Sequence, residues 1–444
     1  MMNKLKVKNG FKKKMLIIFF FYIILEGAFR KWFLPNLNIE IILLRDLFII
    51  FFIFKGFLNN EFDFNSRIEK TIFYWTILVI FWIIIQLIFK QSFFAVSLIG
   101  FRGWVLYFWF SILIFRLTKD YFMIEKNLKI LIYTLIPMSL LITIQFNLPP
   151  EHFINKNIAE GFIFLLVDGI VRPTGTFSFT SGYVQYITFI TPFFLYFIND
   201  SKHFKSFSFK FILLISYVLC IFFSGSRAAF IHSFILIFVS LFIIGKKNII
   251  KNLFIILIIC TIAYFILDVA VESTFNRFEA ASRNEKMSER LIKLLFGGSI
   301  AWTNFSFIGE GIGKSSNLSA IFLKQTSLTG LGFTTGIGRS FLLGENESTR
   351  IIIEGGLLGV LFFISKFILI IYSLKKSIKI LIDYKNTLPL YFSLYFSIQL
   401  LTTPVTGQLT THAFTSLGLT VLLLLLNTEY KKINNKYRND NFRN

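Results

Sequence analysis

Long apolar segments, separated by short polar ones, make up most of this chain. A helix that crosses the apolar core of a membrane needs about 20 mostly apolar residues, and the sequence offers twelve windows of that kind. They cover residues 14–33, 39–58, 69–89, 93–116, 128–147, 180–198, 208–224, 227–244, 249–267, 348–374, 384–403 and 408–426. The pattern predicts an all-α polytopic membrane protein with about 12 transmembrane helices.

One long interruption separates the ninth window from the tenth. It divides the chain into transmembrane helices 1–9 over residues 1–267, a large extracytoplasmic loop over 268–347, transmembrane helices 10–12 over 348–426 and a basic cytoplasmic tail over 427–444. Within the loop, residues 273–296 have the pattern of an amphipathic helix, with apolar positions for the membrane surface and basic positions for lipid headgroups. A solvated helix packed on the loop is the alternative.

The composition supports a membrane protein and argues against nucleic-acid binding. Hydrophobic residues make up 55% of the chain and charged residues 16%, whereas soluble domains have roughly 45–50% and about 25%. Lys-rich cytoplasmic loops of a membrane protein account for the net charge of +22 without any nucleic-acid partner. Cys220 and Cys260 lie in apolar segments without a CxxC spacing, so they indicate neither a disulfide nor a metal site.

Lysine and arginine mark alternate connections between the expected helices. They gather at the N-terminus, in every second loop and in the C-terminal tail, whereas the short turns near Pro35 and Pro404 have none. Because cytoplasmic loops concentrate these residues, we expect both termini in the cytoplasm. The loop after Asn147, the turn at 224–227 and the long loop then lie on the outer face, where polar residues collect.

Four arginines on that outer side suit an anionic group. Arg102 lies between glycines in GFRGW, Arg172 precedes a turn with proline and glycine, Arg227 closes the turn SGSR, and Arg350 enters the tenth helix. Guanidinium is permanently charged and can bind two phosphate oxygens at once, so the group suits a phosphate or a pyrophosphate. Each arginine has a structural alternative. For Arg102 it is an ion pair with a carboxylate such as Asp46.

Acidic residues and one histidine are the candidate general bases. Glu345 and Glu347 stand just before Arg350, and spacings of three and four place Glu347, Arg350 and Glu354 on one helix face. The alternative is an intrahelical ladder of ion pairs. His412, near the outer end of the last helix, is a further candidate base, and a packed histidine is its alternative. No HExxH, GxxxxGK or clustered Cys/His motif is present, so we expect no metal site and no cofactor.

Several short motifs, taken together and in order, carry a resemblance to a known family. They are EGAFRKWFLP from Glu26, GFRGW around Arg102, RPTGTF over 172–177, SGSR over 224–227, GENESTRIIIEGGLLG from Gly344 and PVTGQLTTH from Pro404. With these motifs the sequence resembles the O-antigen polymerase and O-antigen ligase superfamily, particularly its oligosaccharide repeat-unit polymerase-like branch. The resemblance implies transfer of a glycan from a polyprenyl diphosphate carrier without metal or nucleotide sugar. It also makes Arg172 and Arg227 candidates for binding the diphosphate.

The function implied by this resemblance is that of a membrane glycosyltransferase. It would polymerise polyprenyl-diphosphate-linked repeat units into surface polysaccharide at the periplasmic face of the inner membrane, together with other polysaccharide-assembly proteins of the envelope. A ligase, which transfers glycan to a lipid A core, is the first alternative. Ligases are usually discussed with a histidine in the large loop, and residues 268–347 contain none, which leaves Glu345, Glu347 or His412 as the base. A transporter or flippase of lipid-linked glycan is the second alternative, although no matched broken helices support it.

Overall fold

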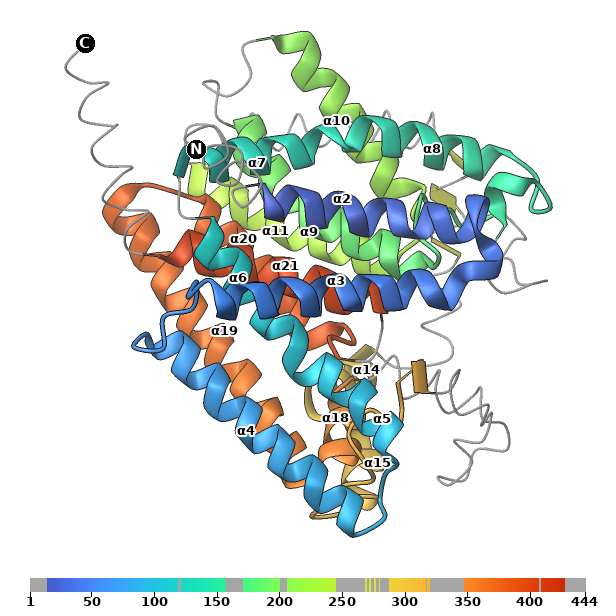
Figure 1. The fold of residues 1–444 in the computed structure, drawn as a ribbon. Coiled ribbons are helices and arrows are strands. Elements are labelled where there is room, and N and C mark those ends of the chain that lie inside the picture. The colour runs from blue at the N-terminus through green and yellow to red at the C-terminus, as the bar shows by residue number, and fades with distance from the viewer. Residues whose placement is uncertain are drawn as a thin grey trace, which may run out of the picture.

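The computed structural model describes a helical protein over residues 14–118, 121–156, 171–199, 206–244, 268–269, 271–272, 275–276, 279, 287–316, 318–319, 347–406 and 409–427 (Figure 1). After α2 (Met15–Ala28) the chain makes a π-helical turn, η1 (Phe29–Phe33), and a 3-10 turn, η2 (Pro35–Leu37). A second π-helical turn, η3 (Arg102–Leu106), joins α5 (Phe94–Phe101) to α6 (Tyr107–Leu117).

The remaining elements follow the apolar segments of the sequence and the long interruption between them. They are α3 (Asn38–Leu58), α4 (Arg67–Ile88), α7 (Tyr121–Tyr133), α8 (Leu135–Asn147), η4 (Phe153–Asn155), α9 (Thr180–Asn199), α10 (Phe207–Phe222), α11 (Arg227–Ile244), α14 (Met287–Phe296), α15 (Gly298–Thr303), α18 (Glu347–Gly355), α19 (Leu357–Tyr384), α20 (Leu388–Thr402) and α21 (Leu409–Leu426). The prediction of a helical protein of the membrane type is therefore confirmed.

Four helical stretches in the described part of the chain are long and apolar enough to cross a membrane: Arg67–Ile88, Phe94–Leu117, Lys126–Asn147 and Leu357–Tyr384. Shorter apolar helices are Phe207–Phe222, Arg227–Ile243, Leu388–Thr402 and Thr410–Leu426. The total of twelve spans stays a prediction, and the expected span at 249–267 lies outside the described residues.

The expectation of one helix over 348–374 is wrong, because the structure divides this segment into α18 and α19. The break is at Gly356, whose φ of 54° and ψ of −126° suit glycine and strain any other residue. A Cβ at this position would also lie 2.3 Å from the carbonyl oxygen of Phe307. The break lets the amide of Leu357 donate to that carbonyl over 3.0 Å, so a distant loop segment takes over a hydrogen bond of the helix.

The predicted amphipathic helix over 273–296 is described in its C-terminal part as α14. This helix ends at Gly297, which has a φ of 86° and donates its amide to the carbonyl of Lys293. Ser348 of α18 donates its hydroxyl to the carbonyl of Leu294 over 2.7 Å. The helix is therefore tied to the first turn of α18 rather than standing alone.

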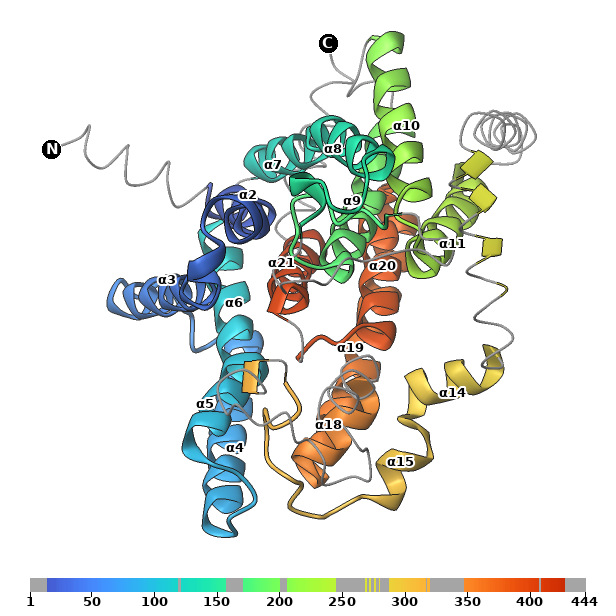
Figure 2. The ribbon, with the colours of Figure 1, turned by 90° about the vertical axis from the view of Figure 1, so that its right-hand side faces the viewer.

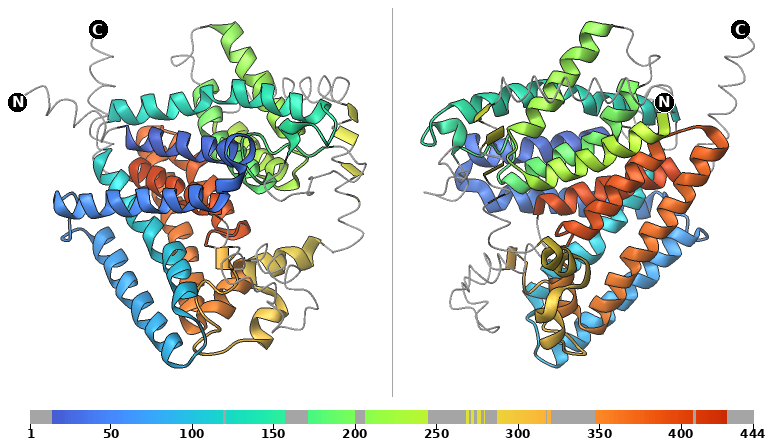
Figure 3. Two further views of the ribbon diagram at one scale, coloured as in Figure 1. Left: turned by 45° about the vertical axis from the view of Figure 1, so that its right-hand side comes forward. Right: turned by 180° about the vertical axis from the view of Figure 1, so that it is seen from behind.

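The helices form a bundle, and a pair of inclined helices, α4 and α19, lies beside it (Figure 1). Figures 1 and 3 show α2, α9, α20 and α21 alongside one another, whereas α4 and α19 slope away from them together. The rings of Trp75 in α4 and Phe362 in α19 stack with their centroids 5.3 Å apart. The short helices α14, α15 and α18 lie together below the bundle in Figure 2.

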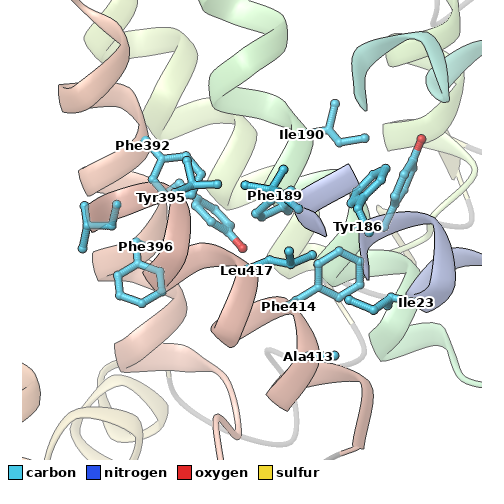
Figure 4. Close-up of a cluster of buried hydrophobic side chains, with 14 of the residues drawn as sticks. Ile23, Tyr186, Phe189, Ile190, Phe392, Tyr395, Phe396, Ala413, Phe414 and Leu417 are labelled. Carbon is cyan, nitrogen blue, oxygen red and sulfur yellow. The ribbon is translucent and has the colours of Figure 1, made fainter. Parts of the chain in front are cut away.

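A buried aromatic cluster joins four helices of the bundle (Figure 4). Phe189 of α9 is at its centre, and its ring centroid lies 5.9 Å from Phe20 of α2, 6.0 Å from Phe392 of α20 and 5.6 Å from Phe414 of α21. Such ring pairs contribute about 0.5–1.5 kcal/mol each beyond their burial. Because Phe414 belongs to this cluster, the preceding turn of α21, which carries His412, is held in place by the core.

Candidate functional site

Arg102 opens the π-helical turn η3 and is buried. Its Nε lies 2.5 Å from a carboxylate oxygen of Asp46 on α3, and its guanidinium donates to the hydroxyl of Tyr107 over 3.4 Å. That hydroxyl donates in turn to Asp46 over 2.9 Å. The ion pair with Asp46, which the sequence offered as the alternative for Arg102, is therefore present, and it fixes the guanidinium in a buried position.

A second buried ion pair adjoins the first. Arg45 precedes Asp46 in α3 but points to other partners, since it donates to Glu26 over 2.7 Å and to the hydroxyl of Tyr107 over 2.9 Å. Glu26 also pairs with Arg30, one helical turn away, at 3.5 Å. Tyr107 thus connects the two ion pairs into one network that spans α2, α3 and the start of α6.

Arg350 of α18 is completely buried and lies at the centre of a separate network of ion pairs. Its guanidinium lies 3.4 Å from Glu354 and 3.5 Å from Glu347, and it also donates to the hydroxyl of Thr406. The ladder of ion pairs that the sequence offered as the alternative to a general base is therefore present. Nε of Arg350 has no acceptor among the described residues, so the guanidinium keeps one donor available.

Glu347 binds the turn between α20 and α21. It accepts hydrogen bonds from the amide of Val405, from the amide of Thr406 over 2.9 Å and from the hydroxyl of Thr406 over 3.0 Å. The ammonium of the buried Lys366 lies 3.6 Å away. A carboxylate that accepts from so many donors has few lone pairs left for a substrate hydroxyl. Glu345 lies outside the described residues.

His412 lies between these two groups of side chains. Its ring centroid is 5.4 Å from that of Tyr107, and the guanidiniums of Arg102 and Arg350 act on it electrostatically. A Cβ on Gly103 would lie 2.8 Å from Cε1 of His412, so the imidazole can occupy this place only beside a glycine. Both ring nitrogens are buried, and the backbone of Thr406 is the hydrogen-bonding group beside the ring. Of the described candidate bases, His412 is thus the one that lies near both Arg102 and Arg350.

The side chains of the two networks on either side of His412, together with Lys31, form a buried polar layer. In the described part of the chain, this layer contains more basic than acidic residues. Six basic side chains and four carboxyl side chains are buried here; the basic ones are Arg30, Lys31, Arg45, Arg102, Arg350 and Lys366, and the carboxyl ones are Glu26, Asp46, Glu347 and Glu354. Lys31 bonds to neutral oxygens, at 2.8 Å to Thr174 and 2.7 Å to the carbonyl of Gly175. Buried charges that are not balanced are costly. The layer is therefore suited to an anion.

Arg172 and Arg227 form a separate group on the loop between α8 and α9 and on the turn between α10 and α11. Nε of Arg172 donates to the carbonyl of Ser224 over 3.3 Å, and Arg227 begins α11 three residues later. Both side chains are half-buried. The structure thus brings these two predicted anion-binding arginines to one turn, and it brings Arg102 and Arg350 together around His412.

A glycine-rich loop, residues 309–316, is a feature that sequence reasoning did not single out. Gly309, Gly311 and Gly313 have φ values of 82°, 120° and 92°, which turn successive amides to one side. The amides of Gly313 and Ser315 donate to the carboxylate of Glu354 over 3.2 and 2.7 Å. Backbone amides in such an arrangement bind anions, and here the anion is a side chain of the protein itself.

Gln86 of α4 fastens the same loop from the other side. Its amide oxygen accepts from the amide of Ile312 over 2.9 Å, and its amide nitrogen donates to the carbonyls of Ile308 and Glu354, over 2.8 Å each. The alternating glycines were visible in the sequence, but their partners are more than 40 residues away. Only the fold reveals that this loop positions Glu354 and thereby Arg350.

Within the described ranges, no group of three or more His, Cys, Asp or Glu residues is placed so that it could hold a metal ion. No protein-family model matches the sequence, and no curated protein is significantly similar to it. The function must therefore be argued from the short motifs and from the chemistry of the layer around His412.

Proposed function

We propose that this protein is a membrane glycosyltransferase that transfers a glycan from a polyprenyl diphosphate carrier to a hydroxyl of a second lipid-linked repeat unit, in the manner of an O-antigen polymerase. The observation that carries the proposal is the burial of His412 against Gly103, within electrostatic reach of the buried Arg102 and Arg350. The diphosphate is the anion that the buried polar layer suits, and the apolar helices suit the polyprenyl chain.

The residues of this layer divide the reaction between them. Arg102 and Arg350 would bind the diphosphate from two sides, with Arg172 and Arg227 reaching it from the rim. The acceptor hydroxyl attacks the anomeric carbon, the bond from that carbon to the diphosphate oxygen breaks, and polyprenyl diphosphate leaves with the electron pair. His412 takes the proton of the hydroxyl. A single displacement of this kind inverts the configuration at the anomeric carbon.

Glu347 is a poorer base than His412 in this scheme. Its carboxylate already accepts hydrogen bonds from the amides of Val405 and Thr406 and from the hydroxyl of Thr406. We assign it the task of holding the turn that precedes α21. Lysine and arginine mark the opposite ends of the expected helices, so the proposal has this layer on the periplasmic side of the inner membrane and both termini in the cytoplasm.

The test is elongation by the purified protein. Full-length protein in nanodiscs is mixed with polyprenyl-diphosphate-linked repeat units, and products are followed by mass spectrometry. Longer carrier-linked glycans and released polyprenyl diphosphate, with an inverted linkage, are expected. Transfer only to a lipid A core would make the protein a ligase, and movement across the membrane without a new glycosidic bond would make it a transporter.

A matched pair of variants on one helical segment links the activity to the proposed layer. Arg102→Ala removes the arginine beside His412. Arg116→Ala removes an arginine that is also ion-paired, with Glu69, but at the other end of α6. Loss of elongation in the first and retention in the second is expected. Equal activity of the two variants would contradict the assignment of Arg102.

A further inference from the structure

A row of exposed apolar side chains extends along α14, α15 and the segment that follows them. Ile292, Phe296, Trp302 and Phe307 have exposed fractions of 57%, 54%, 52% and 63%. Trp302 is held in this exposed position, since its indole donates to the carbonyl of Phe296 over 3.0 Å. Four large apolar side chains in one short stretch are more than the scattered exposure that is normal on a protein surface.

This row is continuous with the surface of α4, a helix long and apolar enough to cross a membrane. The ring of Phe307 lies 6.2 Å from that of Trp82 in α4, and the indole of Trp82 donates to the carbonyl of Ile308 over 2.9 Å. On the same helix Phe81 and Ile88 are exposed. Whatever surrounds the outward face of α4 therefore also meets Phe307.

Charged residues of α14 precede the aromatic residues of this row along the chain. Glu289 is exposed one turn before Ile292 and lies on the same face, two turns before Phe296. Lys293 is exposed on the same face, one turn before Phe296, so the charged side chains stand within the helix and the aromatic residues at its end and beyond. This order matches a helix that enters the boundary between headgroups and acyl chains with its C-terminal end, where tryptophan is commonly found.

We propose that α14, α15 and the segment to Phe307 lie in the interface of the lipid bilayer, with Phe296, Trp302 and Phe307 among the headgroup-proximal parts of the acyl chains and Glu289 in the headgroup layer. This contact would also fix the depth of α18. Ser348 donates to Leu294, as described above, and Thr349 donates to the carbonyl of Gly297. The first turn of α18, which bears Arg350, is therefore hydrogen-bonded to the end of α14.

Fluorescence quenching by brominated lipid tests this placement. The full-length protein is reconstituted in nanodiscs whose phosphatidylcholine carries bromine on the acyl chains. The chain has six tryptophans, so the signal of Trp302 is the difference between the native protein and Trp302→Phe. We expect this difference signal to lose most of its intensity in brominated lipid and to resist iodide in the buffer. Quenching by iodide with none by brominated lipid would overturn the proposal.

Two further variants keep the test decisive if Trp302→Phe folds poorly or gives a weak difference signal. Tryptophan is placed at either end of the exposed face of α14, as Phe296→Trp and Glu289→Trp. Both reporters stand on one face of one helix, and the proposal assigns them different depths in the bilayer. Brominated lipid should quench the first reporter more than the second. A blue-shifted emission that brominated lipid leaves unchanged would indicate a covering protein surface, such as a second copy of this chain, and would also overturn the proposal.

Discussion

Two pairs of arginines, both predicted to bind the diphosphate, are built into the protein in different ways. Arg102 and Arg350 are buried beside Asp46 and Glu354, so each guanidinium is part of an internal ion pair. Arg172 and Arg227 are half-buried and come from a loop and from the first position of a helix. The difference indicates that the first pair has a structural as well as a chemical task, whereas the second pair can be removed at less cost to the fold.

Arg350→Ala should have the largest effect. It leaves Glu347 and Glu354 without their shared cation, and breaking a buried ion pair costs about 3–5 kcal/mol of stability. We expect no elongation and a clear fall in the thermal unfolding temperature of the detergent-solubilised protein. Arg172→Ala is the comparison variant and should unfold close to the native temperature. Equal unfolding temperatures for both variants would remove the structural distinction between the two pairs.

His412→Gln should have the next largest effect, and it concerns activity alone. A positioned general base contributes about 10²–10⁴-fold to a rate, and glutamine keeps much of the volume of the imidazole beside Gly103. We expect kcat to fall by about that factor with little change in unfolding temperature. The pH–rate profile should lose the limb that reports the base.

Glu347→Gln is the control for that assignment, because Glu347 was the other described candidate. If Glu347 only holds the turn at Val405 and Thr406, its amide variant loses activity but keeps the shape of the pH–rate profile. A profile that changes in Glu347→Gln and stays unchanged in His412→Gln would exchange the two roles.

Arg172→Ala and Arg227→Ala should have a smaller and similar effect on activity. A hydrogen bond to a charged group contributes about 1.5–3 kcal/mol, which corresponds to about 10- to 100-fold in kcat/KM. The double variant should lose less than the product of the single losses, because both side chains are expected on one diphosphate. Arg67→Ala, at the exposed start of α4, is the matched control and should elongate normally. Strictly multiplicative losses would indicate two independent sites.

The sequence was sufficient for features that depend on local spacing or on the apolar pattern. Apolar segments located most of the described helices to within a few residues, with α7 and α19 as exceptions, and the spacing of three and four around Arg350 correctly placed Glu347 and Glu354 on one face. Such features depend on helix geometry alone. For this reason they could be read without knowing which other segments lie nearby.

Features that depend on distant partners could not be read in this way. The break at Gly356 needs the carbonyl of Phe307, and the positive φ angles of the loop at 309–313 need the carboxylate of Glu354. Whether Arg102 pairs with Asp46 or stands free for a ligand was likewise open, because a sequence does not state which helices are neighbours. For Glu347 the sequence suggested a base, and only the turn at Val405 and Thr406 indicates a structural task instead.

Thr406→Val should give the smallest effect on activity. It tests whether the hydroxyl of Thr406 positions the guanidinium of Arg350. The hydroxyl of Thr406 accepts from Arg350 and donates to Glu347, whereas the amide of Thr406 binds Glu347 independently of the side chain. Valine keeps the shape and the amide bond but removes both hydroxyl contacts, so we expect about a tenfold loss of kcat/KM, or about 1.4 kcal/mol. Thr415→Val makes the same change at another buried threonine, whose hydroxyl bonds to Gln399 in the bundle. If both valine variants lose activity equally, Arg350 does not depend on Thr406 for its position; if only Thr406→Val does, the turn before α21 belongs to the catalytic centre.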